Sequence, residues 1–194
     1  NEGSANGTVV FQPGDIVKID VGIIQNGWIG DNATTVPAGA IDEPMRRLLA
    51  ATEQSLFEAI DQARDGTPLA DLCGAVQEFV EPRGFSVVRE FVGHGVGKKL
   101  HEEPQIPNHG RPGTGPTLQP GMILAIEPMV NMGTEKVRIL SDNWTVVTND
   151  GKPSAHFEHT VLVLDGGAEI LTRLPEEEQP FLPSTESSGV AAGS

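Results

Sequence analysis

The amino-acid sequence predicts an α+β fold from the order of its segments. Strand-like segments stand both before and after a pair of helical segments, rather than alternating with them. That order is typical of α+β folds and not of repeated βα units. The length of 194 residues suits one domain with a tail. We expect residues 1–173 to form the domain and residues 174–194 the tail.

The first predicted element is a β-hairpin over residues 14–36. Asn26-Gly27 separates two strand-like runs, and both residues accept the positive φ of a two-residue turn. Such a turn places Asp20 opposite Ala33, and Asp31 lies two positions from Ala33 on the same strand. The carboxylates of Asp20 and Asp31 then share one face about 7–8 Å apart, close enough to flank a pair of cations.

Two helices are predicted next. Residues 42–64 carry apolar side chains at helical spacing, behind Asp42 as the expected N-cap. A second helix is predicted over residues 67–82, with Thr67 as its cap and Pro68 at its first position.

The second half is predicted to hold four strands: residues 85–92, 122–130, 144–148 and 155–164. We expect the last two to pair as a hairpin around Asn149-Asp150-Gly151. A Gly-rich loop is expected around His94, and residues 104–119 are expected to be irregular because they hold many Pro and Gly. Beyond Arg173, Glu, Pro, Ser and Gly dominate, a composition that cannot bury enough apolar surface to fold.

Charge and composition exclude several classes of function. The formal net charge of -14, from 27 acidic and 13 basic residues, argues against a nucleic-acid partner. The single cysteine, Cys73, excludes an intrachain disulfide and fits a reducing cytoplasm; on its apolar helix face it is expected to be a small buried residue. No apolar run is long enough to cross a membrane, and no signal peptide is evident. A cytoplasmic protein is expected.

Acidic residues inside apolar runs are the clearest functional signal. Asp20, Glu127 and Glu158 each interrupt an apolar stretch in a different predicted strand. Burying a carboxylate without a partner costs several kcal/mol. Carboxylates that converge on one place repel one another, and divalent metal ions are the natural counter-charge. The alternative is that these residues lie on the wet face of edge strands.

Histidines complete the candidate site. His94 stands between two glycines, where the backbone can approach a ligand closely, and His101 follows in the same loop. One imidazole could bind metal while the other donates a hydrogen bond to substrate, although a lone histidine is more often structural. His156 and His159 flank Glu158 and either support the ligands or are structural. No P-loop, dinucleotide fingerprint or paired-cysteine motif competes.

Several long motifs resemble one family. The stretches GDIVKIDVG, GDNATTV, FVGHGVGKKLHEEPQIPN, PGMILAIEPMVN and HFEHTVLV are similar to the catalytic region of bacterial-type methionine aminopeptidases. The resemblance extends from about Gly14 to Thr172. It implies the pita-bread α+β fold, an antiparallel sheet backed by helices. It also implies a metal-dependent hydrolase that removes the N-terminal methionine from new proteins.

The resemblance implies a set of site residues. Two divalent ions (Co, Mn, Fe or Zn) would be held by five ligands: Asp20, Asp31, His94, Glu127 and Glu158. His101 would polarise the scissile carbonyl together with a metal ion, and Glu127 would move the proton. Leu100 and Trp144 would line the pocket for the methionine side chain. The implied partners are peptides with an N-terminal Met, which the protein would encounter near the ribosome. The protein is expected to be a monomer with no membrane partner.

Two departures from the family pattern accompany this match. Family catalytic domains begin before this sequence does, so we expect an N-terminal part of the domain to be missing. Asn6 stands where the family motif N-E-x-x-x-H-G carries a substrate-contacting His. Two alternatives follow: an Xaa-Pro aminopeptidase or other pita-bread hydrolase, and a non-catalytic binding module or inactive fragment. The residues of HEEPQIPN and EPMVN fit methionine aminopeptidases better than the other pita-bread hydrolases.

Overall fold

Twelve strands, two α-helices and one 3-10 helix make up residues 10–174, the part of the chain that the computed structural model describes. The helices are α1 (Glu43–Ile60), α2 (Leu69–Val80) and η1 (Glu81–Arg83). The strands are β1 (Ile16–Gln25), β2 (Trp28–Pro37), β3 (Ser86–Val87), β4 (Gly93–Gly95), β5 (Glu102–Ile106), β6 (Ile123–Ile126), β7 (Met129–Asn131), β8 (Val137–Ile139), β9 (Val146–Thr148), β10 (Ser154–His156), β11 (Glu158–Leu164) and β12 (Gly167–Ile170). Asn6 and nearly all of the predicted tail lie outside this range.

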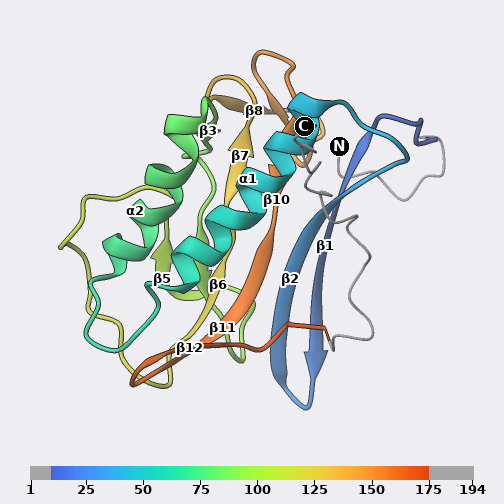
Figure 1. Cartoon of the computed structure of the whole chain (residues 1–194). Coiled ribbons are helices and arrows are strands. Elements are labelled where there is room, and N and C mark those ends of the chain that lie inside the picture. Colours follow the sequence, from blue (N-terminus) through green and yellow to red (C-terminus); the bar gives the residue numbers. More distant parts are fainter. Residues whose placement is uncertain (1–9, 175–194) are drawn as a thin grey trace, which may run out of the picture.

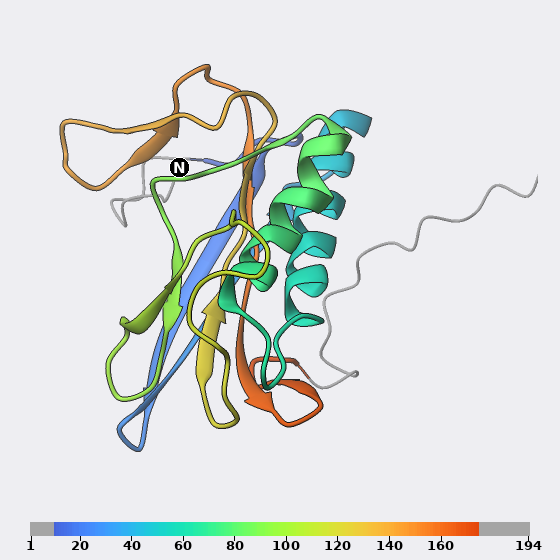
Figure 2. The same ribbon diagram turned by 90° about the vertical axis from the view of Figure 1, so that its left-hand side faces the viewer.

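The main sheet has seven strands in the order β1-β2-β11-β6-β4-β5, with β12 paired to β11. Its pairings are antiparallel, and α1 and α2 lie side by side against one face (Figure 1; Figure 2). Two smaller sheets, β10-β7-β3 and β8-β9, adjoin it. The α+β expectation is therefore confirmed. None of the helices in residues 10–174 is both long and apolar enough to span a membrane.

Strand β11 has two different faces, because successive side chains of a strand point to opposite sides. Val161 and Val163 are fully buried in the hydrophobic core beneath the helices, together with Leu124 of β6. Glu158 and Thr160, at the alternate positions, are also buried, but they point to the other face. One strand thus contributes to the core on one side and to a polar cavity on the other.

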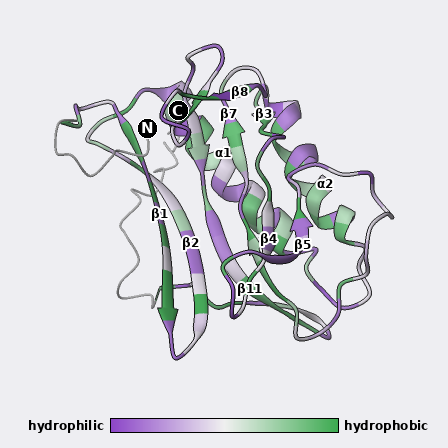
Figure 3. Ribbon diagram, turned by 180° about the vertical axis from the view of Figure 1, so that it is seen from behind, coloured by the Kyte–Doolittle hydropathy of each residue, from purple (hydrophilic) through white to green (hydrophobic). Residues whose placement is uncertain are grey.

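The first hairpin has the predicted register. Asn26 and Gly27 take φ values of 52° and 80°, and Asp20 pairs with Ala33. However, β1 is the outer strand of the sheet (Figure 3). Its apolar residues Ile19 and Val21 are 46% and 49% exposed. Asp20 is exposed as well, so the expectation that it interrupts a buried run is wrong.

The two helices differ from prediction at their ends. Asp42 caps α1 as expected, accepting a hydrogen bond from the Met45 amide at 2.9 Å, but α1 ends at Ile60 instead of residue 64. The N-cap of α2 is Pro68, so the predictions that Thr67 caps and that Pro68 lies at the first helical position are wrong. Thr67 is engaged elsewhere, because its carbonyl accepts a hydrogen bond from the Leu118 amide at 2.8 Å.

Several strand predictions are wrong in extent or pairing. The predicted strand 85–92 is reduced to β3, and the predicted strand 122–130 breaks at Glu127-Pro128 into β6 and β7, which belong to different sheets. The hairpin of residues 144–148 with 155–164 does not form. Instead β9 pairs with β8, β10 with β7, and β11 with β2, β6 and β12. The Gly-rich loop also contains strand β4.

Two buried threonines join β2 to the strands beside it. The Thr160 hydroxyl donates to the Asp31 carbonyl at 2.7 Å and accepts from the Asp31 amide at 3.1 Å. At the other end, the Thr35 hydroxyl donates to the His156 carbonyl at 2.6 Å and accepts from its amide at 2.9 Å. Each hydroxyl supplies both the donor and the acceptor that an opposing backbone residue supplies in a regular ladder. The backbones of Asp31 and His156 are therefore fixed by side chains.

Replacing Thr160 with Val should destabilise the metal-free protein by about 1–3 kcal/mol, because the buried amide and carbonyl of Asp31 would lose their partner. Thr160→Ser keeps the hydroxyl and should retain most of the stability. Urea unfolding followed by circular dichroism measures both variants. Equal stability of the Val and Ser variants would contradict this account of the β2–β11 junction.

Candidate metal centre

Two rows of side chains cross one face of the main sheet. In the first row Asp20 pairs with Ala33, and Ala33 pairs with Glu158. His159 pairs with Ile126, so the same register brings Glu127 beside Glu158 at the end of β6. Side chains directly opposite in an antiparallel pair share a face. The row therefore presents three carboxylates, with the small Ala33 between the first and the second.

The second row runs from Asp31 to His94. The Asp31 amide is hydrogen-bonded to the Thr160 hydroxyl, Thr160 pairs with Ala125, and Ala125 pairs with His94. Neighbouring strands lie about 4.8 Å apart, so the end residues are separated by three such spacings in the order β2-β11-β6-β4. Their side chains nevertheless approach to 3.8 Å, between His94 Nε2 and Asp31 Oδ2. A curled sheet with small residues in the middle of the row makes this contact geometrically accessible.

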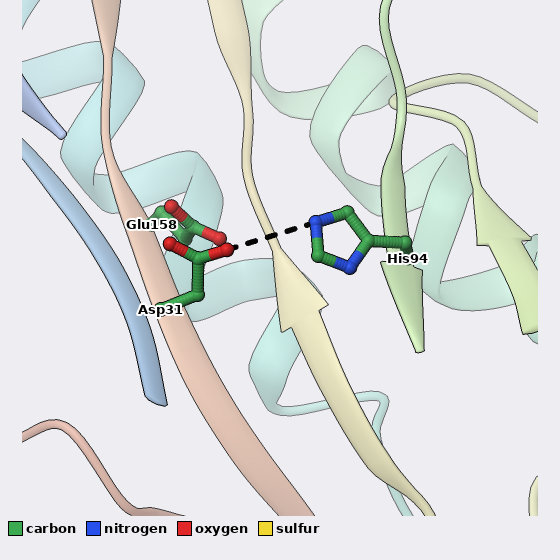
Figure 4. A group of neighbouring side chains, drawn as sticks. All are labelled: Asp31, His94 and Glu158. Atoms are coloured by element: carbon green, nitrogen blue, oxygen red, sulfur yellow. Dashed lines mark ion pairs between the residues drawn. The ribbon is translucent and has the colours of Figure 1, made fainter. Parts of the chain in front are cut away.

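Asp31, His94 and Glu158 form the tightest group in the described part of the chain that could hold a metal ion. Each offers one ligand atom within 4.8 Å of the others, and all three residues are buried. Figure 4 shows the two carboxylates side by side with the His94 ring pointing toward them. Glu127 joins this group, since its Oε1 lies 3.4 Å from His94 Nε2. Asp20 lines the same cavity from the outer strand.

The glycines on both sides of His94 allow strand β4 to lie close to its neighbouring strands. A Cβ atom on Gly93 would collide with the carbonyl oxygen of Ala125, and one on Gly95 with that of Glu103. The His94 ring is oriented by the contact of Nδ1 with the Gly95 carbonyl at 2.9 Å. A carbonyl only accepts, so Nδ1 carries the hydrogen and Nε2 presents its lone pair to the carboxylates. That tautomer suits metal binding.

The buried acids favour their neutral form in the protein without metal. Burial, together with repulsion from the nearby carboxylates of Glu127, Asp31 and Asp20, raises the pKa of Glu158 to about 10. Burial likewise raises the pKa of Glu127 to about 8, with added repulsion from Asp20 and Asp31. Glu158 Oε1 is buried without a hydrogen-bond partner among the described residues. A divalent cation would satisfy this oxygen and reverse the pKa shifts, so the residues fit a metal ion.

The predicted substrate-contacting residues all line one cavity of about 930 Å³ together with the acids. The His101 ring lies edge-on to the His94 ring, with centroids 4.5 Å apart. Leu100 and Trp144 are 40% and 71% exposed, and Trp144 lies in the turn between β8 and β9. Imidazole and apolar groups thus stand at the mouth of the acidic cluster.

The two histidines beside Glu158 separate into different roles. His156 is buried and lies on the cavity side, with Nε2 3.7 Å from Glu127 Oε2. His159 faces the other way, where its Nδ1 contacts the Thr172 hydroxyl at 2.9 Å. Burial lowers the pKa of both imidazoles to about 4. His159 is therefore structural, whereas His156 belongs to the cavity.

Two further sequence expectations can be compared with the structure. Cys73 is 2% exposed and belongs to the hydrophobic core, which confirms the expected small buried residue, and burial raises the pKa of its thiol to about 12. Thr160, which holds Asp31 in place, was not among the predicted site residues. Its position two residues after Glu158 indicates that it shares a face with Glu158, because alternate residues of a strand point to the same side.

Comparison with known proteins identifies the family. Residues 2–165 match metallopeptidase family M24. Methionine aminopeptidase 1 of Bacillus subtilis is 53% identical over 168 residues, which are 87% of this chain and 68% of that protein. The methionine aminopeptidase of Escherichia coli is 42% identical over 175 residues, 90% of this chain and 66% of that one.

Solved structures of a methionine aminopeptidase and of a prolidase are similar to this chain. The methionine aminopeptidase of Thermotoga maritima superimposes with a TM-score of 0.84 at 51% identity, covering 85% of this chain and 66% of that chain. The prolidase of Pyrococcus furiosus shares the fold, with a TM-score of 0.66 at 24% identity. These neighbours confirm the pita-bread fold. The chain spans about two thirds of the length of these methionine aminopeptidases, and it belongs to metallopeptidase family M24.

Proposed function

We propose that this chain is a metal-dependent methionine aminopeptidase, which hydrolyses the first peptide bond of proteins that begin with Met. The observation that carries the proposal is the buried group of Asp31, His94 and Glu158 at the base of a cavity. Relatives 42–53% identical to this chain are methionine aminopeptidases. The Xaa-Pro alternative is less well supported, since the prolidase neighbour is 24% identical.

The proposed cofactor is a pair of divalent ions (Co, Mn, Fe or Zn). The proposed ligands are Asp20, Asp31, His94, Glu127 and Glu158. Asp31 and Glu158 are the proposed bridging residues, as the family resemblance implies, and both are buried in the same close group with His94. When bound, the ions supply Lewis-acid chemistry and neutralise the gathered carboxylates.

The chain's own residues supply binding, orientation and proton movement. His101 would donate a hydrogen bond to the oxygen of the scissile carbonyl, where negative charge develops. Glu127 would carry the proton to the leaving amine, since its carboxyl group lies in the cavity beside the His94 and His156 rings. Leu100 and Trp144 would provide the apolar wall for the flexible methionine side chain.

The cellular setting is part of the same proposal. Substrates would be new chains encountered near the ribosome in the cytoplasm, and residues 1–173 of a monomer would form the catalytic unit. A non-catalytic module is disfavoured because all five proposed ligands are present. The reaction itself therefore provides the first test.

Metal-dependent release of methionine is the expected result. The protein is stripped with a chelator, Co²⁺ or Mn²⁺ is added, and free Met is measured from a Met-Ala-Ser peptide. Release should require the metal, and an Xaa-Pro peptide should not be cleaved. Binding of metal without release of Met would contradict the proposed activity.

Asp31→Ala should lose bound metal while keeping the fold, because Asp31 is the proposed bridging ligand. Its loss should weaken Co²⁺ binding by more than the roughly 10–100-fold that is typical of changes around a ligand. Metal content after dialysis measures the effect, and circular dichroism checks the fold. Asp165→Ala, in an exposed turn, is the matched control. Retention of two ions by Asp31→Ala would overturn the ligand assignment.

Stability of the metal-free protein should fall as pH rises from 6.5 to 8. The raised pKa values of Glu127 and Glu158 mean that the folded state holds protons which the unfolded state has lost above about pH 4.5, and ionisation of the folded state removes that stabilisation. Burial lowers the pKa of His156 and His159 to about 4, so these two rings stay neutral in the folded state across this window. The expected slope is about 1–3 kcal/mol per pH unit.

Urea unfolding in the presence of chelator measures this slope. Glu158→Gln should flatten it, because the amide does not titrate. Saturating divalent metal should abolish or reverse it, since metal binding requires the ionised carboxylates and releases their protons. A metal-free protein whose stability increases with pH across the window would refute the assignment of neutral acids.

A further inference from the structure

His156 is a buried residue whose ring has no assigned partner. It is 8% exposed, ends strand β10 and lines the cavity. Its Nε2 has no hydrogen-bond partner among the described residues and lies 3.7 Å from Glu127 Oε2. The other oxygen of Glu127 faces His94 Nε2 at 3.4 Å. Glu127 therefore stands between two imidazoles, one at each oxygen.

The backbones of both partners are fixed. The Thr35 hydroxyl bonds the amide and the carbonyl of His156, and His156 pairs with Met129 in the β10–β7 ladder. The Glu127 carbonyl accepts a hydrogen bond from Asn108 Nδ2 at 3.0 Å, and Asn108 is itself buried. Only side-chain torsions remain to be set. A contact between the two side chains would determine where the Glu127 carboxylate points.

The two imidazoles offer Glu127 different chemistry. His94 donates from Nδ1 to the Gly95 carbonyl, so its Nε2 presents a lone pair toward Oε1, and the place between these two atoms suits a proton or a cation. At Oε2 the His156 ring can present an N–H group instead. Metal-binding carboxylates are commonly hydrogen-bonded by such neighbours, which orient them. Hydrogen bonds of this kind are often long in an unliganded site and shorten in the working complex.

We propose that His156 is a positioning residue: its Nε2–H group holds Oε2 of Glu127 and thereby directs Oε1 toward the His94 side of the site. The inference rests on the proposed function in one respect, namely that Glu127 binds metal and carries a proton. It assigns His156 to one of the two roles that its place beside Glu158 in the sequence left open. It also explains why a polar ring is buried at this place in the cavity.

Three variants of the full chain test the proposal. His156→Gln keeps a donor of similar reach, His156→Leu keeps the bulk without a donor, and His159→Leu is the matched control on the opposite face of the sheet. Calorimetry measures the Co²⁺ dissociation constants, and peptide hydrolysis gives kcat and KM with Met-Ala-Ser. His156→Leu should weaken Co²⁺ binding about 10–100-fold and lower kcat with KM little changed. His156→Gln should restore most of both, and His159→Leu should leave Co²⁺ affinity unchanged.

Other outcomes would overturn the proposal. Equal Co²⁺ affinity and kcat in the Leu and Gln variants would show that His156 only fills space. A raised KM with unchanged kcat would show that it contacts substrate instead. If His156→Leu does not fold, the comparison of Gln with the shorter Asn at this position decides the question by the same measurements. If the unmodified chain releases no Met, the proposed function fails, while the Co²⁺ affinities still decide the role of His156.

Discussion

Repulsion among carboxylates held in one cavity is the constraint on which the site depends. Asp31 and Glu158 are buried, Glu127 is nearly so, and Asp20 reaches the same cavity from the edge strand. A chain without tertiary structure would separate these groups. They stay together because the opposite face of the sheet is packed against α1 and α2, with Leu124 and Val161 fully buried. Burial of apolar surface on one face thus supports an unfavourable arrangement of charge on the other.

The geometry of that arrangement comes from residue size as much as from residue type. Ala33, Thr160 and Ala125 occupy the inner positions of the two cross-strand rows. Their short side chains leave room for carboxylates and an imidazole to converge over them. Thr160 has a second task, because its hydroxyl replaces backbone hydrogen bonds to Asp31. Small side chains at these three positions therefore leave room above the sheet for the groups that carry the chemistry.

Local features of the sequence predicted more of the structure than long-range ones. The Asn26-Gly27 turn determines its own register, so the position of Asp20 opposite Ala33 was predictable. Acidic residues in apolar runs identified Glu127 and Glu158, although the reasoning was wrong for Asp20 because nothing local shows that β1 is an outer strand. The pairing of β9 with β8 and of β11 with β2 joins segments whose proximity no turn motif encodes. The position two residues after Glu158 could have placed Thr160 on the cavity face, but its bonds to Asp31 depend on the pairing of β11 with β2.

The alternation along β11 makes the core and the site depend on the same strand register. Odd-numbered positions such as Val161 and Val163 face the helices, and even-numbered positions such as Glu158 and Thr160 face the cavity. Inserting or deleting one residue in this strand would exchange the two sets, placing a carboxylate in the hydrophobic core and a valine in the cavity. Length changes here are thus forbidden by two separate requirements at once. Substitutions can vary either face independently, so sequence drift in this strand is confined to replacement and cannot proceed by insertion or deletion.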